Sequence, residues 1–247
     1  MTDLAKKWFD YFGFEGDFAD LETYDEGKRL IKYLCKCEKF KNKFEQKGIP
    51  EEIFDATVRG LIPHVDGCVK STGKIGVKET AQEWLDLVFS FTLFHLGRLQ
   101  FCMFPINYDV PQEGLKKGDN VIDVHIPRGE SLTKEIVDAS FDMAKDFFKK
   151  YFPDFKFDYY TCHSWMLDDT LYKFLDKESN IIRFKEMWQP RVKLKMDSIL
   201  FFVFPNYGTR ENLKNFNPTS SFAKKVKEYA ISGGDFYNVL GVRKAED

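Results

Sequence analysis

The sequence contains few of the residues that build metal centres and disulfide frameworks. Its 247 residues include five cysteines and four histidines. Only Cys35 and Cys37 lie near each other, and a single intervening residue matches no common zinc or redox spacing. The histidines are scattered, at His64, His95, His125 and His163, so we expect no metal site. A low, odd cysteine count also favours a reduced, cytoplasmic protein over a secreted one.

The sequence also has little that would direct it to a membrane or to nucleic acid. The N-terminal stretch MTDLAKKWFDYFGFEGDF has no apolar core of signal-peptide length. The longest apolar run, LDLVFSFTLFHL, contains Asp86 and His95 and is too short to span a bilayer. The formal net charge is −2, with acidic and basic residues interspersed, so electrostatics give no reason to expect a nucleic-acid partner.

Aromatic residues, by contrast, are abundant. The 26 phenylalanines and 11 tyrosines indicate broad aromatic packing or a pocket with aromatic walls. In the first part of the chain, apolar residues recur every three or four positions, which predicts helices. Gly48 ends one such pattern, Pro50 begins the next, and a third helix is expected over residues 78–95.

The apolar pattern changes after Gly97 from a helical period to the alternation of strands. Strands are expected at residues 98–104, 121–126, 156–165, 180–188, 198–204 and 235–242. Helices are expected at residues 132–152, where Thr133 is a good N-cap, and at 168–175 and 218–234. The predicted fold is therefore α+β (α/β-like). A helical N-terminal domain, residues 1–96, precedes a mixed β-sheet flanked by helices, residues 97–247.

The stretch VIDVHIPRGESLTKE, residues 121–135, joins a strand to a helix through a Pro-Arg-Gly corner. On the strand, Asp123 and His125 share one face, which is either exposed or turned toward a site. The first N–H groups of a helix are unpaired and favour anions, and Arg128 could add a bidentate contact. A strand, a glycine-bearing loop and a helix N-terminus form a general phosphate cradle. The alternative is that this corner is only a turn.

The motif TCHSW, residues 161–165, lies at the end of the next strand, where α/β proteins commonly bind ligands. Cys162 could be a nucleophile and His163 a general base, but neighbouring strand residues point to opposite faces and pair poorly. The favoured interpretation of Cys162 is a buried structural residue, whereas His163 stays open between catalysis and structure. Arg98 and Gln100, on an earlier strand, either face the site or cap the strand at the sheet edge.

Several segments resemble one family when they are read in order. They are KIGVKETAQEWLDLVFSFTLFHLGRLQF, NVIDVHIPRGESLT, FFKKYFP with FDYYTCHSWMLD, SNIIRFKEMW and NPTSSFAKKVKEYAISGG. These segments are similar to bacterial acyltransferases that join a helical N-terminal domain to a GNAT-like C-terminal domain. The resemblance covers most of the chain from about Gly48 onward. It implies a GNAT-type fold, in which acyl-CoA lies in a splayed gap between two adjacent parallel strands.

The resemblance also implies roles for individual residues. VIDVHI and FDYYTCHS would be the two strands, and the turn into the following helix would contact the pyrophosphate. The residues expected to contact acetyl-CoA or acyl-CoA are Ile126, Pro127, Arg128, Gly129 and Ser131. His125 or His163 is the expected general base, because an unperturbed imidazole titrates near working pH. Acceptor contacts are expected from Arg98, Gln100, Asp123 and Trp165.

One departure from the family pattern concerns the phosphate turn. GNAT enzymes usually carry a Gln/Arg-x-x-Gly-x-Gly/Ala loop there, and PRGESLT does not reproduce it. Two functions therefore compete. The first is a CoA-dependent N- or O-acyltransferase that acts on an amine or hydroxyl of a small or peptide-like acceptor. The alternative is a non-catalytic GNAT-like module that binds acyl-CoA, another ligand or a protein partner.

Overall fold

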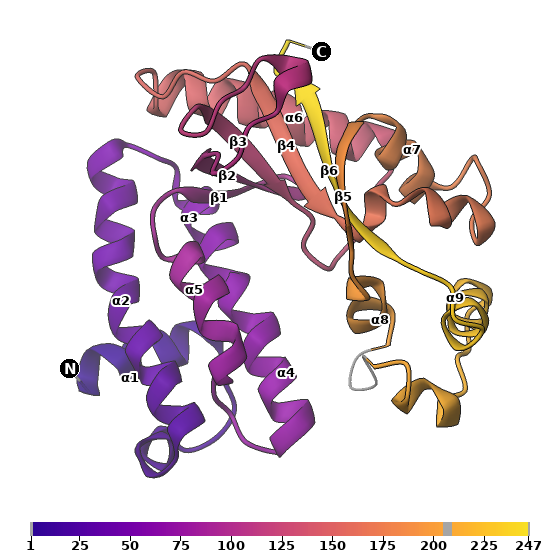
Figure 1. Ribbon diagram of the computed structural model, residues 1–247. Helices are drawn as coiled ribbons and strands as arrows, with labels where there is room; N and C mark the ends of the chain where they lie inside the picture. The colour runs from indigo at the N-terminus through magenta and orange to yellow at the C-terminus, as the bar shows by residue number, and fades with distance from the viewer. Residues whose placement is uncertain (1, 205–208, 247) are drawn as a thin grey trace. The chain divides into compact units, whose positions relative to one another are not determined.

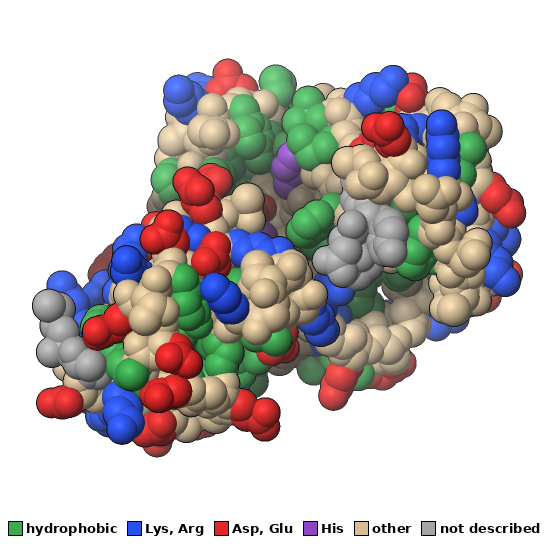
Figure 2. All heavy atoms as spheres, turned by 90° about the horizontal axis from the view of Figure 1, so that it is seen from below, with side chains coloured by type: hydrophobic (Ala, Val, Ile, Leu, Met, Phe, Trp, Pro, Cys, Tyr) green, Lys and Arg blue, Asp and Glu red, His purple; other side chains and the backbone are tan. Residues whose placement is uncertain are grey.

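The computed structural model describes residues 2–204 and 209–246, and the chain divides into two compact units (Figure 1). The first unit comprises Met1–Leu96 together with Lys149–Tyr151. The second comprises Gly97–Phe148 and Phe152–Asp247. Among the helices of the described segments, none has the length and apolar character needed to cross a membrane. On the face drawn in Figure 2, Lys and Arg side chains are interspersed with Asp and Glu, as they are in the sequence.

The first unit is mainly helical. Its helices are α1 (Thr2–Phe12), α2 (Asp25–Lys47), α3 (Glu51–Val58), α4 (Ile62–Thr72) and α5 (Gln82–Val88). Gly48 ends α2 in the left-handed conformation, at φ 68°, as predicted. Helices α2 and α3 and the segment after α5 share an aromatic core that includes Tyr33, Phe40, Phe44, Phe54 and Phe89.

One prediction for this unit was wrong in part. The expected helix over residues 78–95 is a 3-10 turn, Glu79–Ala81, followed by the short α5 and by strand β1 (Leu93–Leu96). Phe91 has φ 67°, which an α-helix cannot accommodate, and the chain turns there. Helix α4 extends to Thr72, and Gly67 lies within it.

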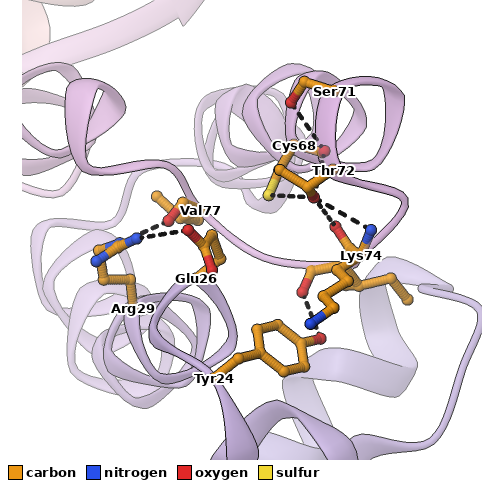
Figure 3. Close-up of polar contacts among 9 residues, drawn as sticks. Tyr24, Glu26, Arg29, Cys68, Ser71, Thr72, Lys74 and Val77 are labelled. Carbon is orange, nitrogen blue, oxygen red and sulfur yellow. Dashed lines mark hydrogen bonds and ion pairs between the residues drawn. The ribbon is translucent and has the colours of Figure 1, made fainter.

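The loop after α4 is fastened to the start of α2 by a small polar network (Figure 3). Arg29 donates to the carbonyl of Val77 at 2.7 Å and contacts the Glu26 carboxylate at 3.2 Å. Tyr24 donates its hydroxyl to the carbonyl of Ile75 at 2.7 Å. Gly76 lies so close to Glu26 that a Cβ there would be 2.5 Å from the Glu26 Cβ. Within the described segments this loop contains no helix or strand, and these contacts hold its backbone in place.

The second unit is built on a mixed sheet. Its strands are β2 (Leu99–Pro105), β3 (Asn120–His125), β4 (Tyr159–Ser164), β5 (Gln189–Lys195) and β6 (Tyr237–Lys244). They lie in the order β2-β3-β4-β6-β5. The β3–β4 pair is parallel and the others are antiparallel, which confirms the predicted α+β class with a mixed sheet.

Helices cover the sheet of this unit. Helix α6 (Lys134–Tyr151) begins at Thr133, whose hydroxyl accepts from the Ile136 N–H, as the predicted N-cap should. Phe141 of α6 packs edge-on against Phe101 of β2 and Tyr160 of β4, so α6 covers the face on which those two rings lie. The other helices are α7 (Asn180–Glu186), α8 (Ser198–Val203) and α9 (Ser221–Ile231).

Two of the predicted strands are helices. Residues 180–188 hold α7 and residues 198–204 hold α8. A short apolar run can form either a strand or a helix. For α7, Ser179 favours the helix because its hydroxyl caps the N-terminal end by accepting from the Ile182 N–H. Strand β5 was missed. It contains Pro190 and alternating basic residues, and a proline is tolerated because β5 is the edge strand.

Candidate active site

The parallel pair β3–β4 is joined over a very short ladder. Ile122 pairs with Tyr160 and Asp123 with Thr161, and the ladder ends there. Strand β3 continues to His125 and β4 continues to Ser164. On their other edges both strands are paired to the end, β3 with β2 and β4 with β6. The two parallel strands therefore separate beyond Asp123 and Thr161, as the GNAT-type gap requires.

One face of this junction carries the polar side chains. Alternation along the strands places Asp123 and His125 of β3 on the same face as Thr161 and His163 of β4. The Thr161 hydroxyl donates to Asp123 Oδ1 at 2.7 Å. His125 Nε2 lies 3.3 Å from Asp123 Oδ2. The Asp123 carboxylate is thus held between a hydroxyl on the neighbouring strand and an imidazole on its own.

Burial determines the protonation of this cluster. The Asp123 and His125 side chains are 20% and 26% exposed. Burial raises the pKa of the Asp123 carboxyl, against the lowering effects of His125, the Thr161 hydrogen bond and His163. Burial lowers the pKa of His125, and Asp123 partly opposes this. A neutral His125 is favoured at neutral pH, and a neutral imidazole can accept a proton.

His163 and Tyr108 complete the surroundings of Asp123. The side chain of His163 is exposed, and it is near enough to Asp123 to affect its pKa. Tyr108 comes from the loop between β2 and β3, and burial together with Asp123 raises its pKa to about 12. The same loop covers the apolar part of this face. That small core consists of Ile106, Val110, Leu115, Val121, Leu240 and Val242.

Gln100, predicted to face the site, lies on this face beside His125, since the two residues are paired across the β2–β3 ladder. Its side chain is 3% exposed, and its Oε1 has no hydrogen-bond partner among the described residues. Cys162 lies on the opposite face and is buried, which raises the pKa of its thiol well above the ordinary value. That environment suits the structural interpretation of Cys162. Trp165 is also buried, in a core cluster with Leu171 and Phe174.

The turn between β3 and α6 is organised by Arg98. Its guanidinium donates to the carbonyl of Pro127 through Nη1 at 2.8 Å and to the carbonyl of Glu130 through Nε at 2.7 Å. Gly129 lies against the same side chain, and a Cβ there would be 3.8 Å from Arg98 Cζ. Arg98 therefore contacts both ends of the corner that sequence reasoning assigned to a phosphate.

Other residues of the turn contact the elements that follow β4. Arg128 is exposed and donates through Nη2 to the carbonyl of Phe202 in α8 at 3.0 Å. Ser131 accepts a 2.5 Å hydrogen bond from Asn180 Nδ2, at the start of α7. Ile126 and Pro127 are half-buried between β3 and these exposed residues. Three of the residues predicted to contact acyl-CoA are therefore exposed: Arg128, Gly129 and Ser131.

A cavity of about 830 Å³ lies on the α6 side of the sheet. Phe141, Tyr160, Arg183 and Arg243 are among the residues that line it. Because Tyr160 is adjacent in sequence to Thr161 on β4, it points to the opposite face. The cavity and the Asp123 cluster therefore lie on different faces of the sheet.

Sequence reasoning missed Thr161 and Tyr108. Thr161 is part of the TCHSW motif and shares its face with His163, so strand alternation alone could have drawn attention to it. Tyr108 belongs to an irregular loop, and no pattern in the sequence indicates where its ring lies. Within residues 2–204 and 209–246, no group of three or more His, Cys, Asp or Glu side chains could hold a metal ion.

Comparisons with known proteins agree with this geometry. A scan against protein families matches residues 93–243 to the family described as GNAT-like C-terminal domain. The curated proteins contain no match to the sequence. Among solved structures, an acyltransferase in complex with decanoyl-CoA and teicoplanin is 26% identical, with a TM-score of 0.77. The match covers 89% of this chain and 66% of that one.

Two further structures are similar. An acyltransferase in complex with CoA and 10C-Teicoplanin is 25% identical, with a TM-score of 0.77, and the match covers 89% of this chain and 66% of that one. An acyltransferase in complex with decanoyl-CoA is 23% identical, with a TM-score of 0.78. That match covers 98% of this chain and 75% of the other, and it supports the fold. The chain spans slightly less than two thirds of the length of the relatives bound to teicoplanin compounds.

Proposed function

Because the chain belongs to the family of the GNAT-like C-terminal domain, we propose that it is a CoA-dependent acyltransferase. It would move an acyl group from acyl-CoA to an amine or hydroxyl of a small or peptide-like acceptor. The observation that carries the proposal is the short β3–β4 ladder, with the Asp123–His125 pair at the point where the two parallel strands separate. Residues 97–247 would form the acyltransferase domain.

His125 is the proposed general base. Its Nε2 lies 3.3 Å from Asp123 Oδ2, and Asp123 would stabilise the imidazolium that forms when His125 accepts the proton. The acceptor's lone pair attacks the thioester carbonyl carbon, a C–N or C–O bond forms, and the C–S bond breaks. The acceptor's proton passes to His125 and then to the departing thiolate, so that protons and charge balance. His163, exposed on the same face, is the second candidate base.

The turn Pro127–Ser131 is proposed to receive the pyrophosphate of CoA. It precedes α6, a helix of 18 residues whose N-terminal end favours an anion. Arg128 would contribute a charge-assisted contact after it releases the carbonyl of Phe202. Ile126 and Gly129 would contribute backbone, and Ser131 a hydroxyl that now accepts from Asn180.

The acceptor is proposed to approach the face that carries Asp123, with Gln100 as a further contact because its buried Oε1 has no partner in the described part of the chain. Similarity to acyltransferases solved with teicoplanin compounds supports a small or peptide-like acceptor. We place the protein in the cytoplasm, because its low, odd cysteine count suits a compartment that keeps thiols reduced.

The test is a panel of acyl-CoAs of increasing chain length, screened first by thermal shift and then by release of free thiol with candidate amines. Thiol release that depends on both an acyl-CoA and an amine supports the transferase. Binding of acyl-CoA without acceptor-dependent thiol release would instead support the non-catalytic module. The absence of the usual glycine-rich loop from PRGESLT is the sequence feature that favours that alternative.

A further inference from the structure

Arg98 spans the two ends of the turn between β3 and α6. Its Nη1 donates to the carbonyl of Pro127 at 2.8 Å, and its Nε donates to the carbonyl of Glu130 at 2.7 Å. The two carbonyls are three residues apart, and the planar guanidinium fixes both at once. Arg98 forms no salt bridge within the described segments, so its donors serve the backbone.

These two hydrogen bonds determine the direction of the neighbouring N–H groups. The described residues contain no cis peptide bond. In a trans peptide unit, the N–H of the next residue points opposite to the carbonyl. When the carbonyls of Pro127 and Glu130 point toward Arg98, the N–H groups of Arg128 and Ser131 point away from it. Both N–H groups belong to the turn that is proposed to hold the pyrophosphate.

Arg98 is itself held at a fixed position relative to α6. Its backbone N–H donates to the Ser140 hydroxyl at 2.7 Å, and that hydroxyl donates to the carbonyl of Ile136 at 3.0 Å. Ser140 is fully buried. Gly97 has φ 67°, and a Cβ there would lie 2.6 Å from Ser140 Oγ, so only glycine allows this close approach. The start of β2 is thereby fastened to α6 beside the turn.

We propose that Arg98 is a positioning residue for phosphate binding, and not the acceptor contact that sequence reasoning suggested. It holds two carbonyls away from the anion and so directs the N–H groups of Arg128 and Ser131 toward it. A carbonyl turned toward a pyrophosphate would repel it, and an N–H would be lost as a donor. This inference rests on the proposed function, since it requires that CoA binds at the turn.

The experiment measures the affinity of CoA and of pantetheine by calorimetry, for the wild type, Arg98→Met and Arg98→Lys. Pantetheine keeps the arm of CoA and lacks the pyrophosphate. Arg98→Met should weaken CoA binding by roughly tenfold or more, because two hydrogen bonds that orient the turn are lost. Pantetheine binding should be unchanged. Arg98→Lys, which keeps one donor, should be intermediate. In kinetics with acyl-CoA as the varied substrate, KM should rise while kcat changes little.

Arg210→Met is the matched control. Arg210 also donates to two backbone carbonyls of the second unit, those of Ala230 and Gly234, each at 2.8 Å, but far from this turn in sequence. Its loss should lower thermal stability and leave CoA affinity unchanged. Equal losses for CoA and pantetheine in the Arg98 variants, or no loss for either, would overturn the positioning role. A wild-type protein that does not bind CoA would instead overturn the proposed function, and this inference with it.

Discussion

Thr161 donates its hydroxyl to Asp123 Oδ1 at 2.7 Å, at the last residue pair of the parallel β3–β4 ladder. The hydrogen bond crosses between the strands at the point where they separate. It occupies one carboxylate oxygen, and the other faces His125 at 3.3 Å. Thr161 therefore fixes the orientation of the carboxylate that in turn orients the proposed base.

The two histidines can be distinguished by substitution. His125→Ala should lower kcat on the order of a hundredfold, because a positioned general base contributes at least that much. CoA affinity should be nearly unchanged, since His125 precedes the phosphate turn. His163→Ala should have a smaller effect, because its side chain is exposed and no hydrogen bond joins it to Asp123 within the described segments. Unaltered turnover in both variants would remove histidine from the mechanism.

The pH dependence of the rate should follow His125. Burial lowers its pKa below the ordinary value of 6.5, so the base stays neutral and kcat/KM is maintained to more acidic pH than a free histidine would allow. Asp123 raises that pKa, so Asp123→Asn should move the acidic limb of the profile to still lower pH while it reduces kcat by about tenfold or more. An acidic limb that stays in place in Asp123→Asn would indicate that another group controls it.

The stability of the fold should also change with Asp123. Its folded pKa is raised, so its favourable contribution is complete below the unfolded pKa and is lost as pH rises through the folded pKa. Above its folded pKa the wild type holds a buried carboxylate, and Asp123→Asn removes that buried charge. Asp123→Asn should therefore melt at a higher temperature than the wild type at pH 8, with a smaller difference at pH 4. Thermal melts at the two pH values measure this, and a difference that is larger at pH 4 would contradict it.

Several elements of the second unit could be predicted from sequence because local signals agree there. Strands β3 and β4 alternate clearly, Thr133 caps α6, and Gly233 follows α9. The strands predicted at residues 180–188 and 198–204 were wrong, because a short apolar run fits either a strand or a helix. Strand β5 was not predicted, because it forms a strand through its pairing with β6 and its composition gives no strand signal.

The candidate site was only partly predictable for a related reason. Strand alternation places His125 with Asp123, and the same rule places His163 with Thr161. The contact between Asp123 and Thr161 depends on the register of two parallel strands separated by α6, and no local pattern records that register. The role of Arg98 depends on backbone carbonyls across a turn, which side-chain chemistry alone does not indicate.

The hydroxyl of Thr161 can be tested by a pair of substitutions that differ only in that group. Thr161→Val keeps the shape and removes the donor, and Thr161→Ser keeps the donor and removes a methyl group. Thr161 is fully buried, so Thr161→Val leaves Asp123 without one hydrogen bond. Above the pKa of Asp123 this should cost about 1.5–3 kcal/mol of stability, the range for a hydrogen bond to a charged group. It should also lower kcat, because the carboxylate no longer holds His125 in one orientation.

Thr161→Ser should stay close to the wild type in kcat and lose only the stability of one buried methyl group, about 1 kcal/mol. CoA affinity should be the same in both variants, since neither alters the turn that follows β3. Denaturant unfolding and steady-state kinetics on the two proteins provide the comparison. If Thr161→Val turned over as fast as Thr161→Ser, the hydroxyl would serve only the packing of β3 against β4, and the orientation of His125 would have to come from Asp123 alone.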